Sequence, residues 1–148
     1  MRNPLKSDGA ASLGLLLARL PMGLFFLLLG VQKLHGGVDK FVGYAQGYLP
    51  HWMPPDLGVR YLQLVPYFEV AVGLMLMLGL LTRLAGLIGA LMVLSFTIAV
   101  TGVRDLQLPF HPNLIYLGVL LTLFFVGPGK LSVDGFLFGR GKRSATPD

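Results

Sequence analysis

Residues 61–103 read YLQLVPYFEVAVGLMLMLGLLTRLAGLIGALMVLSFTIAVTGV, two apolar runs separated only by Thr82 and Arg83. Each run has about 20 residues, the length that an α-helix needs to cross the ~30 Å hydrocarbon core of a bilayer. A two-residue break leaves room only for a tight turn, so the stretch predicts two antiparallel membrane spans, over residues 61–81 and 84–103. Small residues that would let these two helices approach closely are Gly73, Gly79, Gly86, Gly89 and Ala90.

Two further apolar runs flank this pair, from about residue 11 to 34 and from about 108 to 126. The last one stops at the helix-breaking sequence Gly127-Pro128-Gly129. A cleaved signal peptide is the alternative for the first run, because Arg2 and Lys6 precede it. Its last residues contain no small-x-small cleavage site, so the first run is predicted to be a retained helix.

The composition is that of a membrane protein. Hydrophobic residues make up 54% of the chain and charged residues 13%, against about 25% charged residues in an average soluble domain. The predicted fold class is all-α: an integral membrane four-helix bundle in a single domain, residues 1–148, that ends in a basic tail, residues 136–148. The formal charge of +5 is scattered over helix ends and tail, which argues against a nucleic-acid partner.

The basic residues also predict an orientation. Cytoplasmic loops are enriched in Lys and Arg, and an even number of spans places both termini on the same side. With both termini inside, the inner segments hold Arg2, Lys6, Arg83, Lys130, Arg140, Lys142 and Arg143, and the outer segments hold Lys33, Lys40, Arg60 and Arg104. The expected location is a bacterial or archaeal cytoplasmic (inner) membrane, with both termini cytoplasmic.

One outer loop, residues 36–58, is long and aromatic. Apolar side chains recur in it at helical spacing, with Asp39 as a potential helix start and Pro50 as a potential end. These side chains are Phe41, Tyr44, Ala45, Tyr48, Leu49 and Trp52. The pattern predicts an amphipathic helix that lies flat at the membrane interface, and the alternative is a lid over a pocket between the spans.

Residue types exclude several kinds of chemistry. The chain has no cysteine, which rules out thiol–disulfide exchange and thiolate ligation of metals or iron–sulfur clusters. The three histidines are His35, His51 and His111; they lack metal-ligand spacing, and none lies in the middle of a span, where a haem would need it. No metal and no intrinsic cofactor is therefore predicted.

Only two ionisable residues lie well inside the spans, Arg19 and Glu69. Side chains lean toward the N-terminus of their helix, so Glu69 should meet Lys33, which leans into the membrane from the outer end of the first span. Gln32 and His35 would lie near this outer pair. Residues that would face each other on the inner side are Arg19, Arg83, Asp134 and the carbonyls near 127–129. Buried charges of this kind either fix a bundle or mark a functional site.

Several segments, taken in order, resemble the DoxX family of small four-helix membrane proteins. They are the first span with Arg19 and Gly30-Val31-Gln32-Lys33-Leu34, then Pro66 and Glu69 before Gly73-Leu74, then Gly79-Leu80-Leu81-Thr82-Arg83-Leu84-Ala85, and Gly127-Pro128-Gly129-Lys130-Leu131-Ser132-Val133-Asp134. The resemblance extends from about residue 11 to 135. Some members of that family resemble subunits of quinone-linked oxidases or thiosulfate:quinone oxidoreductases, and others are associated with membrane redox complexes. The resemblance thus implies a four-helix fold and a redox setting.

The sequence is compatible with two functions. The first is an accessory membrane subunit of a quinone-linked respiratory or redox complex, in which the charges fix the bundle and larger subunits and membrane lipid surround it. The second is a stand-alone quinone-linked oxidoreductase, with Glu69 and Lys33 as catalytic candidates for proton exchange and Gln32, His35 and Tyr67 as candidates for quinone binding. The accessory function is favoured because the chain lacks an electron-donor site of its own. A transporter is disfavoured by the lack of a discontinuous helix or inverted repeat.

Overall fold

The computed structural model describes residues 8–104 and 112–138, and these residues form helices joined by short turns, without strands. The elements in chain order are α1 (Asp8–Gly36), α2 (Val38–Ala45), the 3-10 helix η2 (Gln46–Tyr48), α3 (Pro55–Leu78), α4 (Thr82–Arg104), α5 (Asn113–Val126) and α6 (Val133–Phe138). Three stretches are long and apolar enough to cross a membrane: Gly9–Gly36, Pro55–Leu78 and Thr82–Ala99. The described chain is therefore a membrane helical bundle.

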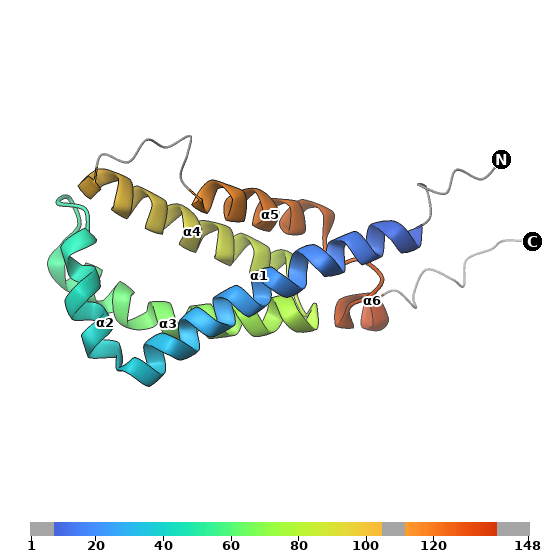
Figure 1. Ribbon diagram of the computed structural model, residues 1–148, viewed down its shortest axis with the longest axis horizontal. Helices are drawn as coiled ribbons and strands as arrows, with labels where there is room; N and C mark the ends of the chain where they lie inside the picture. Colours follow the sequence, from blue (N-terminus) through green and yellow to red (C-terminus); the bar gives the residue numbers. More distant parts are fainter. Residues whose placement is uncertain (1–7, 105–111, 139–148) are drawn as a thin grey trace, which may run out of the picture.

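The helices pack as two pairs, α1 on α3 and α4 on α5, which are joined through contacts between α3 and α4. Figure 1 shows α2 at one end of the bundle, beside the start of α3 and the end of α4, and shows α6 at the other end, near the start of α1. We refer to these as the α2 end and the α6 end. Exposed leucines run along the outward side of α1, at Leu13, Leu17, Leu24 and Leu28, where they contact lipid.

Glycines set the distance between α1 and α3. A methyl group built on Gly30 would lie 2.7 Å from the Pro66 carbonyl oxygen, and one built on Gly73 would lie 2.8 Å from the Gly23 carbonyl oxygen. The two backbones therefore touch directly at two levels. Gly86 has the same role between α4 and α5, where an added methyl group would lie 2.9 Å from the Leu120 carbonyl oxygen. These approaches follow the small-residue packing of membrane helices.

The turn between α3 and α4 falls three residues earlier than predicted. The prediction placed it at Thr82 and Arg83, but α4 already begins at Thr82. Gly79 ends α3 in the left-handed conformation (φ 69°), and Leu81 also has a positive φ of 47°. The Leu80 amide donates to the Met75 carbonyl at 2.9 Å, a hydrogen bond that closes a helix C-terminus. Thr82 and Arg83 do not mark the turn, because Gly79, which lacks a Cβ, makes it.

Other predicted boundaries shift for local reasons. α3 begins at Pro55, six residues before the predicted span, because a proline suits the first turn of a helix. α5 has 14 described residues, about 21 Å at 1.5 Å per residue, and residues 108–111 of the predicted fourth span lie outside the described residues. His111 and residues 139–148 also lie outside the described residues. Residues 136–138, at the start of the predicted tail, belong to α6.

The long loop contains a helix that is shorter than its apolar pattern. Gly37, with φ 96°, is the N-cap of α2, and Asp39 lies in the first turn without making a capping hydrogen bond. After η2 the chain becomes extended at Leu49, and Trp52 lies in a turn. The expectation that Asp39 caps this helix is wrong, because the flexible Gly37 already marks its start.

Candidate functional site

A cavity of about 410 Å³ lies at the α2 end, between the loop segment and helices α1, α3 and α4. This volume is within the range of small-molecule sites, about 300–1,000 Å³. Its fifteen lining residues are Lys33, Phe41, Tyr44, Ala45, Tyr48, Leu49, Pro50, Trp52, Met53, Tyr61, Leu62, Ser95, Phe96, Ile98 and Ala99. All six apolar residues that the sequence pattern placed on one face of the loop helix line this cavity. The loop segment thus covers a pocket.

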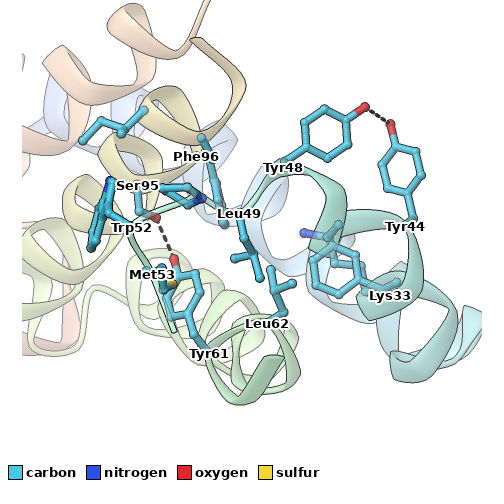
Figure 2. A pocket seen from close by; sticks show the side chains of 15 residues that line it. Lys33, Tyr44, Tyr48, Leu49, Trp52, Met53, Tyr61, Leu62, Ser95 and Phe96 are labelled. Atoms are coloured by element: carbon cyan, nitrogen blue, oxygen red, sulfur yellow. Dashed lines mark hydrogen bonds between the residues drawn. The ribbon is translucent and has the colours of Figure 1, made fainter. Parts of the chain in front are cut away.

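Polar groups lie on two sides of the cavity, and aromatic rings line both sides. Figure 2 shows Lys33 near α2 and Tyr61, Ser95 and Trp52 across the cavity from it, with Leu49 between them. Tyr44 and Tyr48 stand at the edge, where their hydroxyl oxygens are 3.1 Å apart. A flat, apolar ring would therefore meet aromatic walls and a small number of polar groups.

Lys33 is the only charged residue among those that line the cavity. Its ammonium donates a hydrogen bond to Glu69 Oε1 and forms an ion pair with that carboxylate. The Lys33 side chain is 21% exposed and the Glu69 side chain is 0% exposed. The lysine therefore faces the cavity, while the glutamate lies behind it in the bundle.

The close approach of α1 and α3 explains why these two residues meet. Lys33 follows Gly30 by three residues, and Glu69 follows Pro66 by three residues, at the level where the two backbones touch. The helices are antiparallel, and each side chain leans back toward the N-terminus of its own helix. Both side chains therefore point to the same depth. The structure brings together the pair that the depth argument placed there.

Aromatic rings and an unused carboxylate oxygen complete the surroundings of this pair. Lys33 Nζ lies 4.8 Å from the centre of the Phe41 ring and 5.7 Å from the centre of the Phe96 ring, within the range of cation–π attraction. Glu69 Oε2 is buried and has no hydrogen-bond partner among the described residues. Among the described residues, the negative charge of the Glu69 carboxylate is therefore compensated by Lys33 alone.

A second polar group, Tyr61 with Ser95, lies across the cavity. Ser95 Oγ donates to the Met92 carbonyl at 2.8 Å, and the Tyr61 hydroxyl lies 2.6 Å from Ser95 Oγ. Because the serine has one hydrogen, which it gives to Met92, Tyr61 is the donor to Ser95. A bound ligand can take that phenolic hydrogen instead. Neither residue is among the site residues predicted from the sequence, although Ser95 is a polar residue within an apolar span.

The predicted quinone-binding residues lie elsewhere. Gln32 and His35 are exposed on α1, and Tyr67 on α3 is 57% exposed; none of the three lines the cavity. His51 is exposed in the loop. Within residues 8–104 and 112–138, no three His, Asp or Glu side chains gather to hold a metal ion.

A second buried charge, Arg19, lies toward the α6 end. Its Nη1 donates to the Pro128 carbonyl at 2.9 Å, and its Nη2 donates to the Leu131 carbonyl at 2.8 Å. Asp134 and the carbonyls near residues 127–129 were both predicted to lie near Arg19, and its hydrogen bonds go to backbone carbonyls beyond α5. This guanidinium joins α1 to the chain segment that follows α5.

Asp134 has a different contact from the one expected. Its Oδ1 and Oδ2 accept hydrogen bonds from the Leu81 and Thr82 amides at 2.9 and 3.0 Å, and its own amide donates to the Gly79 carbonyl at 3.0 Å. It therefore compensates the N-terminus of α4, where a negative charge is favourable. Arg83 is exposed beside Gly127.

The comparisons with known proteins agree with this architecture. The DoxX family model matches residues 14–102, more than half of the chain, and every residue that lines the cavity falls within this range. No curated protein and no solved structure matches the chain significantly. Together with three apolar helices long enough to span a bilayer, the match shows that this chain is an integral membrane protein that belongs to the DoxX family.

Proposed function

We propose that the chain is an integral membrane subunit of a quinone-linked redox complex and that its cavity holds the quinone head group. The observation that carries this proposal is the Lys33–Glu69 pair at the wall of an aromatic cavity. An ionisable pair inside a span is expensive and by default suggests function. The cavity offers apolar walls for a ring together with a few polar groups that orient it, which is the usual make-up of a cofactor site.

The residues of the cavity match the needs of a quinone. Lys33 has ammonium hydrogens left to donate to one carbonyl, and Tyr61 can turn its hydroxyl from Ser95 to the other. Reduction of a quinone to a quinol consumes two electrons and two protons. Glu69, behind Lys33, is the group proposed to exchange protons, and Lys33 is proposed to pass them to the bound ring.

The electrons have to come from another subunit. The chain has no cysteine and no mid-span histidine, so it offers neither a thiol pair nor haem ligands. This favours an accessory subunit, surrounded by lipid and larger membrane proteins, over a stand-alone oxidoreductase. Purification in mild detergent distinguishes the two: a co-purifying subunit with a redox centre supports the accessory role, and quinone-dependent turnover by the single chain supports the other.

The same proposal includes a topology of four spans in a cytoplasmic membrane. In this topology α5 belongs to the fourth span, and α2 lies at the outer interface. The basic residues of the sequence, which are concentrated near both termini and at Arg83, support cytoplasmic termini. The cavity would then open near the outer face.

Single cysteines test this topology, because the natural chain has none. Cysteine introduced at Gln46, which is exposed in η2, should react with a membrane-impermeant maleimide added to intact cells or spheroplasts. Cysteine introduced at Ala145 should react only after the membrane is permeabilised. Labelling of both positions from the same side would contradict the proposed number or direction of spans.

The sole tryptophan provides a direct test of quinone binding. Trp52 lines the cavity, and a bound quinone should quench its fluorescence. In lipid nanodiscs, decylubiquinone is expected to quench Trp52 saturably, with one quinone bound per chain. Filling the cavity with Ala99→Phe should abolish the saturable component, and Ala71→Phe, on the exposed side of α3, should preserve it. Quenching that rises linearly with quinone, or equally in both variants, would overturn the proposal.

A further inference from the structure

We propose that Glu69 determines the charge of the ligand that the cavity accepts: it restricts the site to neutral polar head groups and excludes acids such as fatty acids. The inference rests on the proposed function, because it concerns the same cavity. It assigns Glu69 a role in specificity, exerted through Lys33, in addition to any role in proton exchange.

The charge of the cavity wall comes from a single residue. Among its fifteen lining residues only Lys33 is charged. An isolated lysine at the wall of an apolar, aromatic cavity would be a strong site for a carboxylate. Here Glu69 already occupies that role from behind the wall, since the two side chains form an ion pair. The wall and its buried partner together carry no net charge.

Lys33 can still donate hydrogen bonds into the cavity while it is paired with Glu69. An ammonium has three hydrogens to donate, and the structure assigns one of them to Glu69 Oε1. The cavity-facing part of Lys33 otherwise meets the rings of Phe41 and Phe96. A carbonyl oxygen can therefore accept a hydrogen bond from Lys33 while the ion pair stays intact.

An anionic head group would have to disrupt this arrangement. To compensate a ligand carboxylate, Lys33 would need to weaken its bond to Glu69, whose side chain is fully buried and whose Oε2 has no hydrogen-bond partner among the described residues. Leaving a buried charge without its partner is strongly unfavourable. Two carboxylates sharing one ammonium would also repel each other.

Competition experiments in nanodiscs test the inference, with Trp52 quenching by decylubiquinone as the readout. The two competitors are dodecanoate, which is an anion, and its neutral methyl ester, which has the same chain and one additional methyl group. The wild type is expected to release quinone to the ester, with dodecanoate at least about tenfold weaker. Glu69→Gln should reverse this preference, because Lys33 then lacks its internal carboxylate. Glu69→Asp should keep the wild-type preference. Asp56→Asn, which removes an exposed acid from the same helix, should also leave it unchanged.

The outcomes separate the two proposals. If decylubiquinone quenches Trp52 saturably but dodecanoate competes with the wild type as well as the ester does, the specificity role of Glu69 is overturned and quinone binding stands. The same holds if Glu69→Gln folds and keeps the preference for the ester. Even if Glu69→Gln fails to fold, equal competition by dodecanoate and the ester in the wild type overturns the specificity role. If decylubiquinone gives no saturable quenching, the proposed function itself fails, and the inference fails with it.

Discussion

Replacing Arg19 by leucine is expected to destabilise the folded protein by about 3 kcal/mol or more and to lower its yield from membranes. The Arg19 side chain is 2% exposed and donates to the carbonyls of Pro128 and Leu131. Leucine would leave two partly buried acceptors without these donors, and an unsatisfied buried polar group costs about 1–3 kcal/mol. Thermal unfolding in detergent, together with the folded fraction from size-exclusion chromatography, measures the effect.

Two variants separate the hydrogen-bonding role of Arg19 from its charge. Arg19→Lys keeps the charge but lacks the planar fork that serves two carbonyls at once, so it should recover only part of the lost stability. Arg60→Leu removes an exposed arginine from the start of α3 and should leave stability nearly unchanged. If Arg19→Leu unfolds at the same temperature as Arg60→Leu, this arginine does not hold α1 to the segment after α5.

The Lys33–Glu69 pair should give the second large effect, and an unequal one. Lys33→Met leaves a fully buried carboxylate without its partner, for which the expected loss is about 3–5 kcal/mol. Glu69→Gln leaves an ammonium that is 21% exposed toward the cavity, so its loss should be smaller. The double variant should recover part of the stability lost by Lys33→Met, because neither charge is then left alone. Unfolding of all four proteins under the same conditions measures the coupling between the two residues.

The same variants distinguish a structural from a catalytic role of Glu69. Losses that simply add in the double variant would show that the pair contributes no coupling energy. If Glu69 exchanges protons, Glu69→Gln should give a folded, assembled complex that has lost quinone-dependent turnover. A folded, assembled complex with full turnover would remove the catalytic proposal and leave the accessory function.

The sequence predicted the polar contacts that depend on depth along a helix. Residue counts along the spans, with the lean of side chains toward the N-terminus, placed Lys33 beside Glu69 and Arg19 near the carbonyls around Pro128. Depth follows from the rise per residue, which varies little between helices. The apolar pattern of the loop was equally informative, because one face of it lines the cavity.

The rotation of side chains around a helix, and contacts made by the backbone, were harder to predict. Gln32 is next to Lys33 in the sequence but is turned about 100° from it on the helix, and it is exposed. Asp134 binds the amides of Leu81 and Thr82 because the segment after α5 folds back under the turn between α3 and α4. Such a contact depends on a turn made by Gly79, which the span pattern placed within a helix.

Photo-crosslinking with an azido-quinone in nanodiscs tests most directly whether a quinone occupies the cavity beside Lys33. After illumination, digestion and mass spectrometry, labels are expected on the loop and α4 residues that line the cavity, within 41–53 and 95–99. Excess decylubiquinone should suppress this labelling, and Ala99→Phe should suppress it while Ala71→Phe does not. Labels spread over the lipid-facing leucines of α1, insensitive to excess quinone and to Ala99→Phe, would show that the quinone does not occupy the cavity.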